Sequence, residues 1–406
     1  MEIIVEKLTF LQFRTLAIVL IIALISMFGT DIHLASLPAI ANSLHTNKVH
    51  MQQSISVFLF GMGVSMLIYG PLSDKIGRKP IIILGLIIAI LGNFASIYAT
   101  DIHYFLFCRV IQGIGLGIGS GIGRTIFADV LNREQLAIIG SYFSMVISVS
   151  PLFAPIIGGY LQTLFGWQSN FILLTILSLM ALILYIKYCP ETNIHKNKNL
   201  SLPTMLYNYL SLLKNHILIY SIILTGIGLS AIMVYTTTSA FILQNEFKLT
   251  PILYGWVTMI AGCGIFAGKL VGPSLIKRVT SLQTIKIGLI LILMSGIYLT
   301  IISLCGYLTI TNFMLAVFIS YLGNGFMMPS VTAQALSGFK QKRGTASALF
   351  GACQMIIASS SSSIIASIHY NGSKIIAIAY LVLGALGLIV YDKLKKALIM
   401  GNNADY

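Results

Sequence analysis

Long apolar runs alternate with short polar breaks along the whole chain. Most runs hold about 20 residues or more, the length that a helix needs to cross the hydrocarbon core of a bilayer. The strands of a membrane barrel would be about 10 residues long with alternating polarity, and these runs are too long and too uniform for that. The pattern therefore predicts twelve membrane-spanning helices. They cover residues 14–40, 51–72, 80–99, 102–129, 135–163, 168–188, 216–243, 252–276, 283–304, 307–335, 344–369 and 374–397.

Composition supports the same fold class. The 406 residues include 25 Lys and Arg and 11 Asp and Glu, so that only 9% are charged, while 57% are hydrophobic and the mean hydropathy is +0.92. A soluble enzyme of this composition would aggregate, because about a quarter of an ordinary soluble domain is charged. Intrinsic disorder is excluded as well, since it requires low hydrophobicity. We expect an all-α integral membrane protein whose surface faces the lipid bilayer.

Two six-helix halves are indicated by a polar break near the middle of the chain and by a weak internal repeat. A Gly-Pro pair at Gly70 closes the second run, and another at Gly272 closes the eighth run, 202 residues later. Two pseudo-symmetric halves that face each other across a central cavity are typical of transporters. We place the N-terminal half at 1–188, a cytoplasmic linker at 189–215 and the C-terminal half at 216–406.

The Lys and Arg residues gather on one side of the predicted membrane. That side holds 20 of the 25 and the opposite side holds 3, while Arg109 and Arg124 lie within the fourth run. Because positive residues are retained in the cytoplasm, we expect both termini on the cytoplasmic side of an inner membrane. The net charge of +14 then reflects topology, and we expect no nucleic-acid partner.

The sequence shows none of the usual patterns of an enzyme. Its five cysteines are scattered, without a CxxC pair or the spacing of zinc ligands. No nucleophile triad is evident, and the glycine-rich run at 113–123 has no strand before it, as a nucleotide loop would. We expect no enzymatic activity, no metal and no cofactor.

The polar loop between the second and third runs resembles a family signature. Its residues, Gly70-Pro-Leu-Ser-Asp74-Lys-Ile-Gly77-Arg78-Lys79, are similar to the G-x-x-x-D-x-x-G-R-[RK] loop of the major facilitator superfamily. In that family the Asp and Arg form a charge relay with an acid at the end of the fourth span. The resemblance implies a conformational-switch loop, and a plain positively charged cytoplasmic loop is the alternative. The residues of the switch loop are Gly70, Asp74, Gly77, Arg78, Lys79 and Asp129.

The fourth run carries a second string of this kind. Arg109-Val-Ile-Gln112-Gly-Ile-Gly is similar to the R-x-x-Q-G-x-G signature, which the family associates with proton coupling. An arginine inside a membrane is costly unless it is paired or hydrated, so its presence points to function.

The fifth run carries the third string. Ala154-Pro155-Ile-Ile-Gly158-Gly159 resembles the G-P-x-x-G-G antiporter signature, although Ala154 and Ser150 stand where that signature has glycine. The resemblance implies an exporter with a helix kink at Pro155, Gly158 and Gly159. The alternative is a proline and two glycines that only bend a packed helix.

Two longer strings resemble one branch of the superfamily, the Bcr/CflA-type drug exporters. They are residues 31–40 in the first run and residues 344–354 in the eleventh, and residues 124–129 are also similar. The branch has an aromatic residue where this chain has His33, a proline where it has Ala35 and an arginine where it has Ala128.

The few charged residues in the predicted bilayer are chiefly Asp31, Arg109 and Arg124. Asp31 lies near the outer end of the first run, and Arg109 lies at a similar depth in the fourth. We expect these two to lie close together, directly or through Gln112, and to form the proton-coupling site, with a structural salt bridge as the alternative. Arg124 lies about four turns closer to the cytoplasm, where it attracts an anionic substrate or pairs near Asp129.

Aromatic, methionine and small polar residues in the runs are further candidates for a substrate cavity, because such side chains form an adaptable wall. Ordinary helix packing is the alternative for each of them. The candidates are Arg124, Tyr142, Met145, Tyr235, Thr238, Trp256, Asn324 and Gln354.

Taken with the resemblance, these features predict a secondary active transporter. We expect proton-coupled efflux of small amphipathic or cationic compounds by alternating access. An exporter of a specific metabolite, such as a siderophore or a sugar, is the alternative on the same scaffold, and a non-transporting membrane receptor is the alternative of another class. The partners are then protons, a small-molecule substrate and the lipid bilayer, and the resemblance suggests a monomer.

Overall fold

A computed structural model describes residues 8–132, 135–136, 139–140, 145–193, 202–339, 343–368 and 372–403. Every regular element within these residues is a helix. The helices are α2 (Phe10–Asp31), η1 (Leu34–Ser36), α3 (Leu37–Ser43), α4 (Lys48–Ile76), α5 (Arg78–Ile97), α6 (Ile102–Val130), α8 (Ser150–Phe165), α9 (Gln168–Tyr188), α10 (Leu202–Leu212), α11 (His216–Phe241), η2 (Ile242–Glu246), α12 (Pro251–Arg278), α13 (Ser281–Leu304), α14 (Ile310–Ser337), α15 (Arg343–Ser367) and α16 (Lys374–Asn403).

Twelve helical segments of the described chain are long and apolar enough to cross a membrane, as the apolar runs predict. The first span, Phe10–Ser43, is assembled from α2, η1 and α3, and the seventh, His216–Glu246, from α11 and η2. Several spans begin at a side-chain cap. The carboxylate of Asp101, for example, accepts a hydrogen bond from the backbone N–H of Tyr104 (3.0 Å) at the start of α6.

The two Gly-Pro pairs do not end their helices, contrary to our expectation. Helix α4 continues through Pro71 to Ile76, and α12 continues through Pro273 to Arg278. A proline inside a helix removes one hydrogen bond and bends the helix, but it need not stop it. Helix α4 ends instead at Gly77, whose φ of 116° suits glycine.

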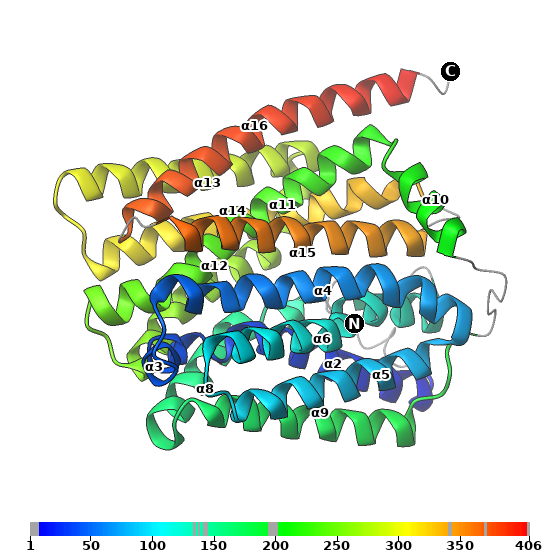
Figure 1. The fold of residues 1–406 in the computed structure, drawn as a ribbon. Coiled ribbons are helices and arrows are strands. Elements are labelled where there is room, and N and C mark those ends of the chain that lie inside the picture. The colour runs from blue at the N-terminus through cyan, green and yellow to red at the C-terminus, as the bar shows by residue number, and fades with distance from the viewer. Residues whose placement is uncertain are drawn as a thin grey trace.

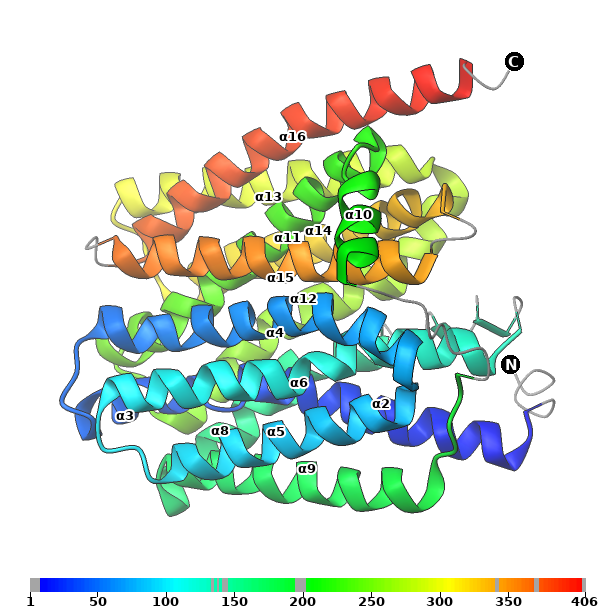
Figure 2. The same cartoon turned by 45° about the vertical axis from the view of Figure 1, so that its right-hand side comes forward.

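The helices form two bundles that lie against each other (Figure 1). We call α2 to α9 the N-terminal bundle and α11 to α16 the C-terminal bundle. The end at which α4 meets α5 is called the loop end, and the end at which α6 begins is called the opposite end. Helix α10 lies across the C-terminal bundle near the loop end (Figure 2), where the Tyr209 hydroxyl donates to the Leu67 carbonyl of α4 (2.9 Å).

Glycines on α6 bring the core of the N-terminal bundle together. A side chain at Gly113 would collide with the backbone carbonyl of Phe58 on α4, and one at Gly115 would collide with the backbone of Ala89 on α5. Such small residues let membrane helices approach closely enough for backbone packing. Helix α6 is therefore held between α4 and α5, which fixes the position of Arg109.

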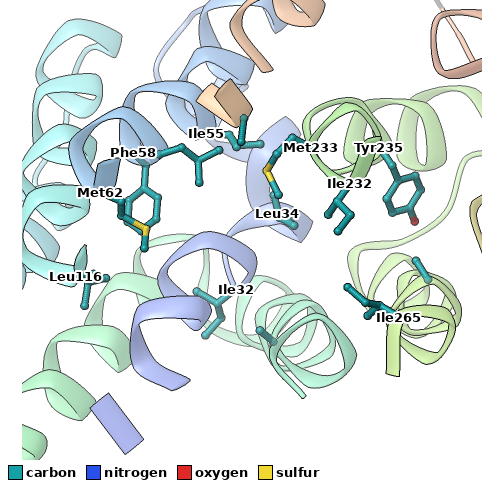
Figure 3. Packing of buried hydrophobic residues seen from close by; sticks show 14 of the residues in the cluster. Ile32, Leu34, Ile55, Phe58, Met62, Leu116, Ile232, Met233, Tyr235 and Ile265 are labelled. Atoms are coloured by element: carbon teal, nitrogen blue, oxygen red, sulfur yellow. The ribbon is translucent and has the colours of Figure 1, made fainter. Parts of the chain in front are cut away.

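The two bundles meet along two pairs of helices, α4 with α15 and α8 with α12. On α4, Gly63 packs against Ala352 and Ile356 of α15. Hydroxyl groups join the bundles nearer the opposite end, where Ser56 donates to Ser362 (2.9 Å) and Thr237 contacts the same hydroxyl (2.7 Å). Figure 3 shows apolar side chains of both bundles facing one another at this interface.

Candidate functional site

A small cavity lies between the bundles. The N-terminal bundle contributes the one acid of its lining, Asp31, which is 9% exposed at the point where α2 breaks into η1. The C-terminal bundle contributes hydroxyl and aromatic groups. The lining residues are Asp31, Leu34, Pro151, Pro155, Tyr235, Thr236, Thr258, Ala261, Gly262 and Tyr321.

Asp31 is held by a hydroxyl group. The buried side chain of Ser150, at the start of α8, donates a hydrogen bond to Oδ2 of Asp31 (2.8 Å). Hydrogen bonds to an ionised carboxylate are stronger than those between neutral groups. The serine that departs from the antiporter signature thus provides the hydrogen-bond donor of the candidate acid.

Arg109 is completely buried on α6, and carbonyl oxygens rather than acids surround it. Its Nη1 donates to the backbone carbonyl of Gly29 (3.1 Å) and to Oε1 of Gln112 (2.6 Å). The guanidinium also lies over the Phe58 ring, 4.2 Å from its centroid, which is a cation–π arrangement. Within the described residues Nη2 has no hydrogen-bond partner.

The expected contact between Asp31 and Arg109 is not formed in this structure. Among the described residues no ion pair joins them, and Arg109 reaches α2 at Gly29, two residues before the acid. Gln112 does not connect them either, because its amide nitrogen donates to Ser96 (2.6 Å) and to the Gly92 carbonyl on α5. Each side chain instead makes hydrogen bonds of its own, Asp31 with Ser150 and Arg109 with carbonyl oxygens.

One of the aromatic, methionine and polar residues predicted to line a substrate cavity does so in the structure. Tyr235 lines the cavity, and its hydroxyl donates to Thr258 (3.3 Å). Trp256 is 47% exposed on the surface of α12 and does not line the cavity, and Arg124 is exposed nearer the loop end.

The other cavity candidates that the structure describes do not line this cavity either. Thr238 and Asn324 are buried and donate to backbone carbonyls of their own helices, those of Val234 and Ser320. Gln354 is buried on α15, and Met145 is half-buried. Tyr142 lies outside the described residues. A residue type that suits a cavity wall does not reveal which way its helix is turned.

Sequence reasoning missed most of the cavity wall. Thr258, Ala261 and Gly262 occupy one face of α12, and Pro151 lies one turn before Pro155, which the sequence predicted only as part of a helix kink. Residues three and four positions apart share a helix face, so small and polar residues at this spacing are the signal that could have found them.

His33 occupies the aromatic position of the branch signature and is completely buried beside α9. Its ring lies 6.1 Å from that of Phe171, and neither ring nitrogen has a hydrogen-bond partner among the described residues.

The switch-loop residues meet at the loop end. The Arg78 guanidinium forms ion pairs with Asp74 (2.5 Å) and Asp129 (3.1 Å) and also donates to the Ser73 hydroxyl (2.6 Å). Arg78 is buried, and the arrangement joins the ends of α4 and α6 to the start of α5. Several charges in one network with good geometry contribute more than an isolated surface pair.

The first residues after α9 add contacts that the sequence did not predict. The Glu191 carboxylate accepts hydrogen bonds from the backbone N–H groups of Arg78 (2.8 Å) and Lys79 (3.1 Å). An acid at a helix N-terminus is favoured by the helix dipole. Lys79 in turn donates to the Cys189 carbonyl (2.8 Å). Burial raises the pKa of the Cys189 thiol to about 11, so the thiol carries no charge in this network.

The antiporter-like string makes close contacts on both sides of α8. A side chain at Gly158 would collide with the Ile32 carbonyl, and one at Gly159 would collide with the Pro251 carbonyl at the start of α12. These glycines therefore let α8 pack against both the broken first span and the C-terminal bundle. Pro155 lies inside α8 and lines the cavity.

Comparisons with known proteins agree with this architecture. The model of the Major Facilitator Superfamily matches residues 19–362. Multidrug resistance protein D of Escherichia coli is 27% identical over 372 residues, which cover 91% of this chain and 93% of that protein. A bicyclomycin resistance protein homolog of Haemophilus influenzae is 25% identical over 371 residues, covering 90% of this chain and 91% of that protein.

A solved structure has the same fold. The Escherichia coli xylose transporter XylE, in a partially occluded inward-open conformation, superposes with a TM-score of 0.75 at 13% identity and covers 96% of this chain and 98% of that chain. The sequence relatives are transporters, and the chain is a transporter rather than a receptor or an enzyme. With its twelve candidate spans and its family match over most of its length, the chain belongs to the Major Facilitator Superfamily.

Proposed function

We propose that this transporter exports small amphipathic or cationic compounds in exchange for protons. The observation that carries the proposal is the buried carboxylate of Asp31 in a cavity that both bundles line. A carboxylate there either binds a proton or attracts a cationic group, and it is not occupied by an ion pair among the described residues. Intramembrane acids are rare and mark ion or substrate pathways.

The opposite wall of the cavity suits an amphipathic compound. Tyr235 and Tyr321 present aromatic rings packed edge to face (5.8 Å between centroids), and Thr236 and Thr258 present hydroxyl groups. Aromatic surfaces with a few polar groups bind varied ligands. The relatives named for multidrug and bicyclomycin resistance support this substrate class.

Arg109 and Gln112 are assigned a positioning role. Through Gly29, Arg109 ties α6 to the segment of α2 that ends at Asp31, and through Ser96, Gln112 ties α6 to α5. A change in the charge of Asp31 would therefore act on a helix that is fixed to the core of the N-terminal bundle.

The switch loop is proposed to stabilise one conformation of the transporter. Its residues are joined within the N-terminal bundle at the loop end, and the cavity beside Arg78 is also lined by Gly344 and Thr345 at the start of α15. Movement of the two bundles about the interface would change this contact. Residues 1–188 and 216–406 would then move as two halves, joined by the linker at 189–215.

We propose that the loop end faces the cytoplasm of a bacterial cell and that both termini lie on that side of the inner membrane. The uneven count of Lys and Arg, 20 against 3, supports this orientation. A monomer suffices for the mechanism, because each chain holds both walls of the cavity.

The test is proton release from the purified transporter in weakly buffered detergent solution. Tetraphenylphosphonium is added as a cationic probe and chloramphenicol as a neutral one, and a pH indicator reports protons. We expect release from the wild type with tetraphenylphosphonium and none from Asp31→Asn. Equal release from both proteins would remove Asp31 as the coupling site.

Resistance of an expressing strain to a panel of lipophilic cations tests the breadth of the substrate range. Protection against several unrelated cations is the expected result. Protection against one compound or against none would contradict polyspecific efflux.

A further inference from the structure

Helix α10 is rich in apolar residues but is not one of the twelve candidate spans. Its residues, Leu202–Leu212, include no charged side chain. The spans run from one end of the molecule to the other, whereas α10 runs across them near the loop end (Figures 1 and 2). When the spans cross a bilayer, α10 therefore lies parallel to the membrane surface.

One face of α10 is held by the protein. Tyr209 and Leu212 are buried, and they pack in an apolar cluster with Phe350 of α15. The Tyr209 hydroxyl donates to the Leu67 carbonyl of α4 (2.9 Å), which belongs to the other bundle. These contacts hold α10 over the line where α4 meets α15, and they also fix which way the helix is turned.

A second face of α10 is apolar but exposed, and we call it the outer face. Leu206 and Leu210 lie one turn apart and are 55% and 63% exposed, and Tyr207 beside them is 71% exposed. Leu213, directly after the helix, continues this face and is 37% exposed. Large exposed apolar side chains that gather on one face mark a contact with a membrane or with another protein.

The third side of α10 is polar. Thr204, Asn208 and Ser211 follow one another at spacings of four and three residues, which places them on the same side of the helix. This side differs from both the buried face and the outer face. A helix with protein on one side, apolar groups on the second and polar groups on the third has the pattern of an interfacial helix that lies in the plane of a leaflet.

The depth of α10 agrees with such a position. Tyr209 meets α4 at Leu67, five residues inside the apolar run that ends at residue 72. At the helical rise of about 1.5 Å per residue, this contact lies about 8 Å below the end of the run. Interfacial helices bury their apolar face about 5–10 Å into the boundary between headgroups and acyl chains. Helix α11 begins at His216, four residues after α10 ends at Leu212, so the seventh span enters the membrane close to this level.

We infer that the outer face of α10 docks into the lipid leaflet at the loop end. Lipid fits this face better than a protein partner does, because the face consists of four side chains, whereas a stable protein interface takes about 20–30 residues from each side. Residues 192–215 include three lysines and no acid, which suits the anionic surface of a leaflet. The inference goes beyond the proposed export and depends neither on its substrate nor on proton coupling.

The test places one new tryptophan on α10 of the full chain in nanodiscs, in a Trp256→Phe background. Leu210→Trp and Tyr207→Trp report from the outer face, and Thr204→Trp is the matched control on the polar side. Phosphatidylcholine brominated near the headgroup end of its acyl chains quenches a tryptophan that lies among lipids, and iodide quenches one that lies in water. Subtracting the emission of the background protein removes the contribution of the buried Trp167.

We expect the brominated lipid to lower the emission of both outer-face reporters about twofold and that of Thr204→Trp by less than about a fifth, with the order reversed for iodide. Quenching of the outer-face reporters by iodide and not by the brominated lipid would overturn the inference. Quenching by neither would overturn it as well, because protein then covers the face. Each reporter replaces one exposed apolar side chain by another, so α10 should keep its fold, and a circular dichroism spectrum equal to that of the wild type checks this.

Discussion

The two bundles share a helical scaffold but differ in chemistry. In the N-terminal bundle, ionisable groups occupy the interior at Asp31 and Arg109 and the loop end at Arg78. The interior of the C-terminal bundle is occupied by neutral hydroxyl and aromatic groups, such as Tyr235, Tyr321 and Tyr380. One bundle therefore carries the candidate charge chemistry around the cavity, and the other provides a wall that tolerates varied ligands.

The junctions that follow the two Gly-Pro pairs show the same difference. At the repeat offset of 202 residues, Ile276 stands in the place of Asp74 and Thr280 in the place of Arg78. The N-terminal junction is held by the ion pairs of Arg78, whereas the C-terminal junction is a neutral capping box between Thr280 and Gln283. Both junctions start a helix, and within the described residues the ionic one joins three helices.

The largest effect is expected at Arg109. A lysine there cannot reach Gly29, contact Gln112 and cover the Phe58 ring together, because an ammonium lacks the planar fork of a guanidinium. Arg109→Lys should slow proton-driven efflux about a hundredfold, as for the loss of a precisely positioned group. The measurement is substrate efflux from inverted vesicles energised by a pH gradient.

Asn324→Ala is the matched change in the C-terminal bundle. Asn324 is equally buried, but within the described residues its amide bonds only to the Ser320 carbonyl of its own helix. We expect efflux within about threefold of the wild type. Equal losses at the two positions would show that the bundles do not differ in this respect.

The two helix junctions provide the second comparison. Arg78→Gln removes both ion pairs and leaves Asp74 and Asp129 facing each other as like charges. We expect a decrease of about tenfold in the maximal efflux rate, because the switch loop no longer favours one conformation. Thr280→Ala removes a neutral cap, which costs about 1 kcal/mol of stability and should change the efflux rate less than twofold.

The third comparison concerns the two walls of the cavity. In Ser150→Ala the ionised Asp31 loses its hydroxyl donor, so the affinity for tetraphenylphosphonium should fall about fivefold. Thr258→Ala removes a hydroxyl from the facing wall that contacts Tyr235 instead, and its affinity should change about twofold. Calorimetry measures the binding. An equal loss of affinity in the two variants would contradict the expected difference between the two walls.

The fold was predictable because the length of an apolar run directly reflects the thickness of the bilayer. The first span shows how closely the predicted bounds agree with the structure, because the run at 14–40 corresponds to Phe10–Ser43. Its internal break after Asp31 was not predicted, although Thr30, Asp31 and His33 surround the break and Pro38 lies in the first turn of α3. The Gly-Pro pairs do not end their helices, since packing in a membrane supports a bent helix.

The site was predictable where one residue type is rare and not where contacts decide. Asp31 stood out because few acids lie inside apolar runs. Its partner Ser150 is 119 residues away, and Glu191 is 113 residues from Arg78, so neither contact follows from local spacing. No ion pair joins Asp31 and Arg109 among the described residues, because similar depth does not specify on which side of each helix a charge lies.

The smallest effect is expected at Glu191, which extends the ionic junction into the segment after α9. Glu191→Gln keeps one oxygen that can accept from Arg78 or Lys79 but removes the charge that favours a helix N-terminus, at a cost of about 0.5–1 kcal/mol. The midpoint of thermal unfolding in detergent should fall by a few degrees, and efflux should stay within about twofold of the wild type. The matched change, Gln283→Ala, breaks a neutral capping box at the start of α13. The difference between its unfolding midpoint and that of the wild type should not depend on salt. The difference between wild type and Glu191→Gln should shrink at high salt, and a difference that is independent of salt would show that the junction of the N-terminal bundle is no more ionic than its counterpart.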